Sequence, residues 1–383
     1  MKTSLNRREF LKVSGAAASA IALPGKPFAM AGPGPAGKTR HVLLVAFAGG
    51  VRSRDTIGTP ANVPNLMRLA EKGVVFPNCG IQNTGHYGAT LSIFTGVTEY
   101  MGIRENERGY NPTLFEYLRE GLTLPASKVW LSTNNGAQGV NFAYSLNRKF
   151  GPSYGANVID GEGLFNEEFR EVLQQFGRPK TDSEQETQAL EKLRKSIRSN
   201  HSGAALNDAE TAARVEKYIL DELTGNDTTR MTGPAAGDAK ALNIAGKILQ
   251  LFRPTFLGVS LSNADIAHGS YNAYVDVIRR NDQEVGGILD VVERDTELRE
   301  STAIFVLPEF GRDRDLNQRN GLDHGDGSPE LQKVACIAYG PDFRQGRVVD
   351  SDVSSIDVCP TICKLFSVEP EQSKGKVLPK LFV

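Results

Sequence analysis

The segment 41–50, HVLLVAFAGG, decides the fold class of this chain of 383 residues. Seven consecutive apolar residues follow His41, and two glycines end the run. A strand with one face in water would alternate apolar and polar side chains. The continuous run therefore predicts a strand that is buried on both faces, as the strands of parallel sheets are.

Further strands and helices are expected on either side of this segment. The segments 128–132, 255–261, 302–307 and 334–339 have the composition of buried strands. The segment 62–73 has helix start and stop signals, a capping box begins at Thr113, and 271–292 carries an apolar stripe at helical spacing. Strands that alternate with helices predict an α/β fold, with a mostly parallel central sheet and helices on both faces.

Asp282 lies on the apolar face of the expected helix 271–292. An ionised carboxylate in apolar surroundings is costly unless it is hydrogen-bonded. We therefore expect Asp282 to be buried and hydrogen-bonded near the functional site.

The first 31 residues contain the parts of a twin-arginine export signal. Arg7 and Arg8 precede a mildly apolar stretch, 13–23, and Ala29-Met30-Ala31 supplies a cleavage site with small residues. We expect residues 1–31 to be recognised by the twin-arginine translocation machinery and then removed, so that the mature protein is periplasmic or secreted. The alternative is an amphipathic N-terminal helix.

The rest of the chain is predicted to be a linker and one domain. Residues 32–39 form the linker, and residues 40–383 form the α/β domain. Within this domain, 151–238 is charged and helical in places. That composition predicts a helical insertion, which serves either as a cap facing the substrate or as a solvated decoration.

Charge and hydropathy argue against nucleic-acid binding and against a membrane span. Without residues 1–31 the formal net charge is −5, so the mature protein lacks the excess of basic residues that binds nucleic acid. No apolar run is long enough for a stable membrane span once the signal is set aside. The four cysteines lack zinc-binding spacing, and we interpret them as buried apolar residues. A strained Cys359–Cys363 disulfide is the alternative.

Polar residues follow three of the predicted strands directly. They are Arg52 after the first, Asp265 and His268 after the second, and Glu309 and Arg312 after the third, with His324 in the loop beyond. Because the carboxyl ends of parallel strands share one sheet edge, these side chains are expected to meet. Carboxylates with imidazoles predict a divalent metal site. The alternative for Asp265 and His268 is a local capping arrangement.

The order of several short motifs resembles the alkaline phosphatase and sulfatase superfamily. It is most similar to the twin-arginine-exported, sulfatase-like branch in which a Glu-Phe-Gly-Arg motif is followed by Asp-His. The similarity covers residues 41–368 apart from the middle insertion. Its markers are Val63-Pro64-Asn65-Leu66, Leu69-Ala70, Gly73-Val74, Phe76, Asn78, Thr95-Gly96, Pro112-Thr113-Leu114-Phe115, Asp265-x-x-His268-Gly269 and Ile356-Asp357-Val358-x-Pro360-Thr361-Ile362.

The resemblance also implies a ligand set, because active relatives hold two metals and a Ser, Thr or modified Cys nucleophile. The first metal of such relatives takes an Asp-His pair and a distant His. These ligands correspond to Asp265, His268 and His324, although the pair is spaced one residue closer here. The implied cofactor is a divalent ion, either zinc or else manganese or calcium.

The second metal of such relatives is poorly matched. In those relatives it takes an Asp after the first strand, an Asp-His pair after a later strand, and the nucleophile. Here these positions are occupied by Gly49, by Glu309-Phe310 and by His86, respectively. The resemblance therefore implies a site for one ion, with Glu309 or His86 as a fourth contact. Thr84 is the substitute nucleophile if the alignment shifts locally.

Two functions follow from these expectations. In the first, the protein is a one-metal hydrolase of a small phosphate or sulfate ester, with His86 as acid, base or extra ligand. Arg52 or Arg312 would then bind the anionic group through paired hydrogen bonds. In the second, the fold has lost catalysis and serves as a metal- or anion-binding scaffold. Sharing one ion requires the nearest ring nitrogens of His268 and His324 to lie within about 6 Å.

Overall fold

The computed structural model describes residues 37–100, 107–164, 188, 201–202, 213–215, 217–219, 221–222, 228 and 231–383. The expected signal peptide and most of the expected linker and insertion lie outside these residues. Among the residues that are described, no helix is both long and apolar enough to cross a bilayer.

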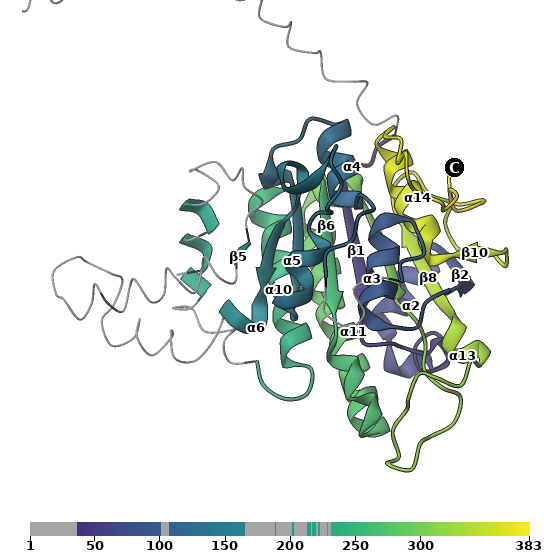
Figure 1. Cartoon of the computed structure of the whole chain (residues 1–383). Coiled ribbons are helices and arrows are strands. Elements are labelled where there is room, and N and C mark those ends of the chain that lie inside the picture. The colour runs from purple at the N-terminus through teal and green to yellow at the C-terminus, as the bar shows by residue number, and fades with distance from the viewer. Residues whose placement is uncertain are drawn as a thin grey trace, which may run out of the picture. The chain divides into compact units, whose positions relative to one another are not determined.

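One mixed, mostly parallel sheet forms the centre of the fold (Figure 1). The strand order is β10-β2-β8-β7-β1-β6-β3-β4-β5, and β9 pairs with β2. The strands are β1 His41–Phe47, β2 Val74–Gly80, β3 Val129–Thr133, β4 Asn157–Asp160, β5 His201–Ser202, β6 Phe256–Leu261, β7 Thr302–Pro308, β8 Lys333–Tyr339, β9 Arg347–Val348 and β10 Val353–Ser354. The strand predicted from the segment 41–50 is β1, which lies between β6 and β7 and runs parallel to both.

Helices cover both faces of the sheet, as predicted. Alternate residues of β1 point to opposite faces, because successive side chains of a strand do so, and both faces are apolar. Leu43, Val45 and Phe47 pack in one core with α2 (Pro64–Lys72), α10 (Ala236–Phe252) and α11 (Tyr271–Arg294). Val42, Leu44 and Ala46 pack in the other with α3 (His86–Thr95), α4 (Leu114–Gly121), α5 (Gly136–Phe142) and α14 (Val358–Leu365).

Short helical segments complete the described elements. They are η1 Ser53–Asp55, η2 Pro60–Asn62, η3 Ala126–Lys128, η4 Gly151–Tyr154, α6 Gly161–Leu164, η5 Asn263–His268, α12 Thr296–Ser301, α13 Pro329–Gln332 and η6 Ser355–Asp357. The capping box at Thr113 is present at the start of α4. All four cysteines are free and buried, which confirms their interpretation as apolar residues.

Strand direction differs from the simplest expectation at β8. This strand is antiparallel to both β7 and β2. The connection 309–332 therefore starts and ends at the same edge of the sheet instead of crossing back over a face. Because of this, the whole loop that carries Glu309, Arg312 and His324 stays at one edge.

Asp282 is buried and hydrogen-bonded, as expected from its place on α11. Its carboxylate accepts hydrogen bonds from the backbone N–H groups of Asn65 and Leu66 at 3.0 and 2.8 Å. These groups are unpaired donors at the start of α2. Asp282 thus caps α2 and holds it against α11, which is a structural role and not a contact with the site.

The range 151–238, expected to be an insertion, contains part of the sheet. β4 runs parallel to β3, and β5 is antiparallel to β4. The start of α10 also falls in this range, and most of the remainder lies outside the described residues.

Candidate metal and anion site

The loops after β7, β1 and β6 begin side by side. Phe47, the last residue of β1, is in register with Leu261 and Pro308, the last residues of β6 and β7. The chain therefore leaves the sheet at the same level in all three places. α3 adds a fourth element, because His86 is its first residue.

Asp265, in η5, is the point where the site side chains meet. Its Oδ1 atom accepts a hydrogen bond of 2.5 Å from Arg312 Nη2. The same oxygen lies 3.0 Å from His86 Nε2 and 3.3 Å from His268 Nε2. His86, more than 170 positions away in the sequence, thus shares one carboxylate oxygen with His268 and Arg312.

His86 is held by a buried carboxylate on its other side. Its Nδ1 atom is 2.6 Å from Oε1 of Glu309, and Thr90 donates a 2.5 Å hydrogen bond to Oε2 of Glu309. Both oxygens of Glu309 are therefore used inside the protein. His86 Nε2 forms an ion pair with Asp265 Oδ1 but is not aligned for a hydrogen bond with any described residue.

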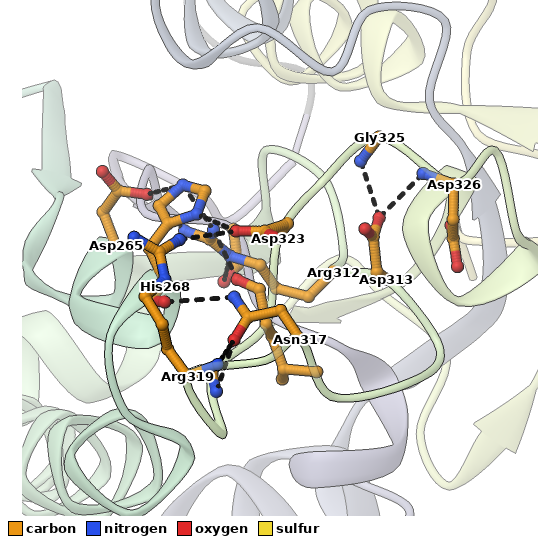
Figure 2. A network of polar contacts seen from close by, with 12 residues as sticks. Asp265, His268, Arg312, Asp313, Asn317, Arg319, Asp323, Gly325 and Asp326 are labelled. Atoms are coloured by element: carbon orange, nitrogen blue, oxygen red, sulfur yellow. Dashed lines mark hydrogen bonds and ion pairs between the residues drawn. The ribbon is translucent and has the colours of Figure 1, made fainter.

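His268 has the same arrangement with a different carboxylate. Its Nδ1 atom is 2.6 Å from Oδ1 of Asp323, and its backbone oxygen accepts a 3.1 Å hydrogen bond from Asn317. Figure 2 shows this network between η5 and the loop 309–332. Asn317 therefore holds the backbone of His268, and Asp323 holds its ring so that Nε2 points toward Asp265 and Arg312.

His324 closes the cluster through ring contacts. Its ring centroid lies 4.8 Å from that of His86, 5.0 Å from that of His268 and 5.1 Å from that of Phe310. Within the described residues, neither nitrogen of His324 forms a hydrogen bond. Its ring nitrogens therefore remain available to bind a ligand.

The two arginines expected to bind an anion are both buried and engaged within the protein. Arg52 donates to Asp55 at 2.6 and 3.2 Å and to the backbone oxygens of Asp313 and Arg314 at 3.0 and 2.8 Å. Arg312 binds Asp265, His268 and three backbone oxygens. Thr84, the substitute nucleophile, is half-buried in the loop before α3.

Nearby charges and burial shift the pKa values of His86 and His324 in opposite directions. Burial alone would lower the pKa of His86, but the charges of Glu309 and Asp265 raise it to about 10. Burial and the nearby charges of His86 and Arg312 lower the pKa of His324 to about 4. His86 is therefore a cation at neutral pH, whereas His324 is neutral and keeps a free lone pair.

Burial also acts on the two central carboxylates. It would raise the pKa of Asp265, but the nearby charges of His86 and Arg312 lower that pKa. For Glu309, burial prevails and raises the pKa, although His86 and Thr90 oppose it. Asp265 is consequently ionised under all physiological conditions.

Four of these side chains form a donor set that can hold a metal ion. One ligand atom from each of His86, Asp265, His268 and His324 lies within 4.8 Å of the others. This meets the distance condition for His268 and His324. The Nε2 of His86 faces Asp265 Oδ1 within the set, and imidazole nitrogen with carboxylate oxygen is the donor chemistry of zinc. The residues present therefore fit a divalent ion.

Comparison with known proteins gives matches in structure and none in sequence. No protein-family model matches the chain, and no curated protein is similar to it. A variant of alkaline phosphatase PafA superimposes with a TM-score of 0.60 and 11% identity, over 92% of this chain and 100% of that chain. PsFucS1 sulfatase from Pseudoalteromonas sp. gives 0.51 and 14%, over 91% and 71%. The lipoteichoic acid synthase LtaP from Listeria monocytogenes gives 0.51 and 8%, over 90% and 75%. The chain has the alkaline-phosphatase fold.

Two residues of this site were not expected from the sequence. Asp323 orients His268, and Thr90 orients Glu309. Asp323 precedes His324 directly, but nothing local shows that it bonds a histidine 55 positions away. Thr90 could have been found, since it lies one helical turn after His86 on the same face of α3.

The loop that carries Asp265 and His268 is held from within the alkaline-phosphatase-like core by Asp238 of α10. Asp238 is fully buried and accepts hydrogen bonds from the backbone N–H of Asn263 at 3.1 Å and from Asn281 Nδ2 at 2.7 Å. Burial raises the pKa of Asp238 from 3.8 to about 7, although these hydrogen bonds oppose the shift.

Asp238→Asn is expected to stabilise the protein above pH 7. The pKa of Asp238 is higher in the folded state than the unfolded value of 3.8. Its contribution to stability is therefore complete below pH 3.8 and is lost as the pH rises toward 7. Asparagine avoids this loss, on the order of a few kcal/mol, and can donate to Asn281 Oδ1, which lacks a partner among the described residues. The measurement is the Tm of both proteins from pH 4 to 9. A Tm difference that does not change with pH would contradict the prediction.

Proposed function

We propose that this protein is an exported hydrolase of phosphate or sulfate esters that works with one divalent ion. Asp265, His268 and His324 hold the ion, and His86 lies beside it as a protonated hydrogen-bond donor, or as a fourth ligand once its Nε2 proton is lost. Zinc suits this set of nitrogen and oxygen donors best, with manganese or calcium as alternatives. The substrate class follows from the fold together with a site of this kind and is a small anionic ester.

The observation that carries the proposal is the orientation of two imidazoles by carboxylates. His86 is fixed by Glu309 and His268 by Asp323, each through Nδ1. In both rings Nε2 then faces the common oxygen of Asp265. Histidines that bind metals nearly always bond a carboxylate or carbonyl oxygen through the other ring nitrogen, which sets tautomer and direction. A cluster serving only to cap a helix has no need of such paired orientation.

The chain's own residues supply the rest of the proposed chemistry. When bound, a divalent ion in such a site polarises an ester oxygen and lowers the pKa of a bound water to about 7. His86 is a cation at the start of α3, so it can donate a hydrogen bond to an anionic group or a proton to a leaving oxygen. The unpaired backbone N–H groups in the first turn of α3 favour negative charge at the same place. Thr84 is the hydroxyl in the loop before α3 for a route with a covalent intermediate.

A second function, a metal- or anion-binding scaffold without catalysis, is favoured by one observation. Arg52 and Arg312 direct their hydrogen bonds to groups of the protein itself. Neither guanidinium is therefore free to clamp a phosphate or sulfate group as it would in a typical anionic-ester site.

The deciding experiment compares metal content with turnover in the wild-type protein. Elemental analysis of the purified mature protein should find one divalent ion per chain, and p-nitrophenyl phosphate or sulfate should be hydrolysed. An ion without turnover would favour the scaffold. Neither an ion nor turnover, even after incubation with zinc, manganese and calcium, would refute the hydrolase and the metal-binding form of the scaffold.

The export part of the proposal rests on Arg7, Arg8 and the site 29–31. Changing both arginines to lysine should leave the uncleaved precursor in the cytoplasm, because the receptor distinguishes guanidinium groups from ammonium groups. Fractionation followed by immunoblotting measures this. Unchanged delivery of the cleaved variant by the twin-arginine pathway would refute the export proposal.

A further inference from the structure

Arg312 lies wholly buried inside the site, with 0% of its surface exposed. Its Nε atom donates to the oxygen of Gly50 at 3.3 Å. Nη1 bonds the oxygen of Leu322 and Nε2 of His268, both at 3.2 Å. Nη2 donates to the oxygen of Gly49 and, at 2.5 Å, to Asp265. All five N–H groups of the guanidinium are thus used, and none is left for a substrate.

The five acceptors around Arg312 have the character of a cation site. They are three backbone oxygens, one carboxylate oxygen and one imidazole nitrogen, and they come from the loop after β1, from η5 and from the loop 309–332. Backbone and carboxylate oxygens are also the ligands of hard metal ions. Here a side chain supplies the positive charge.

The backbone beside the guanidinium leaves no room for a side chain at position 49 or 50. A Cβ atom at Gly49 would lie 2.7 Å from both the N atom of Asp265 and the O atom of Ser262. Gly50 has a φ of +67°, and a Cβ atom there would lie 2.9 Å from Arg312 Nε. The loop after β1 therefore closes on Arg312 only because both residues are glycine.

We propose that Arg312 is a positioning residue that acts as a built-in cation. Its Nη atoms occupy a cation position against Asp265 Oδ1 and His268 Nε2, and a divalent ion that used these two atoms would have to displace the guanidinium. Arg312 thereby limits the site to a single divalent ion. The statement about the divalent ion rests on the proposed function, whereas the cation position itself does not.

The test is to remove the side chain and offer other cations. Arg312→Ala should lower the Tm, because five acceptors lose their donor. Millimolar guanidinium or methylguanidinium, far below denaturing concentrations, should raise the Tm of this variant by several degrees and leave the wild type unchanged. Equilibrium dialysis with manganese should find one more bound ion per chain in Arg312→Ala than in the wild type.

Arg52→Ala is the matched control. Arg52 is equally buried and bonds a carboxylate and backbone oxygens, but it touches none of the four donor side chains. Its variant should lose stability without a gain in bound manganese. If Arg312→Ala also gains no ion and no stability from guanidinium, Arg312 has only a packing role and the proposal is overturned.

A lysine variant covers the case in which Arg312→Ala does not fold. Folding of Arg312→Ala only when guanidinium is present would support the proposal. If it folds under no condition, Arg312→Lys decides, because it keeps the charge. It should bind as many ions as the wild type, and an additional ion would overturn the proposal. A wild type without any bound ion would refute the proposed metal function, yet the guanidinium measurement would still test the cation position.

Discussion

Replacing His324 with alanine is expected to lower the affinity for the divalent ion by at least about 100-fold, more than the loss of an outer hydrogen-bond partner usually costs. His324 is the one donor of the set whose nitrogens form no hydrogen bond within the described residues. Burial and the charges of His86 and Arg312 lower its pKa to about 4. Its ring is therefore neutral at pH 7, which is the form that a metal requires.

The measurement is the dissociation constant for zinc by competition with a chromophoric chelator. His41→Gln is the control, because His41 starts β1, at the end of the strand remote from the site, and bonds the oxygen of Pro254. That variant should bind zinc like the wild type. Equal zinc affinity in His324→Ala and the wild type would remove His324 from the ligand set.

Replacing Glu309 with leucine is expected to cost about 3–5 kcal/mol of stability, because it breaks a buried ion pair and leaves one partner unpaired. Glu309 is 0% exposed and receives hydrogen bonds from His86 and Thr90. Leucine would leave the Thr90 hydroxyl without its acceptor and His86 Nδ1 with only the backbone oxygen of Ala48 at 3.2 Å. Glu309→Gln keeps an acceptor at this position, so it should cost about 1 kcal/mol. Denaturation in urea measures both.

Glu309→Gln also tests whether Glu309 orients His86 for the metal or only stabilises the fold. Glu309→Gln replaces one of the two carboxylate oxygens with an amide and so weakens the hold on the His86 ring; zinc affinity should therefore fall about tenfold. Glu116 is a matched control, since it is also 0% exposed and its carboxylate is fully bonded, to Thr113, Ser145 and Gly151. Glu116→Gln should lose stability without a change in zinc affinity. A similar zinc affinity in wild type and Glu309→Gln would show that Glu309 serves the fold alone.

Much of the site was predictable because its residues follow strands that can be recognised locally. Asp265, His268 and Glu309 come directly after the apolar runs of β6 and β7, and such runs show burial in any context. Once β1, β6 and β7 are parallel neighbours, their ends must meet. The partners of these residues were not predictable. Asp323 bonds His268 and Thr90 bonds Glu309 only because of the path of the loop 309–332 and the place of α3.

The amino-acid pattern alone determined the α/β class, the strand β1 with apolar residues on both faces, the capped start of α4, the apolar face of α11, and the polar residues after three strands. These features depend on side-chain period and turn chemistry, which act over a few residues. Only the tertiary structure decided that β8 runs antiparallel, that Asp282 caps α2, and that the guanidinium of Arg312 lies inside the site. These depend on which distant segments become neighbours, and the energy of a buried charge is set by those neighbours and not by the adjacent sequence.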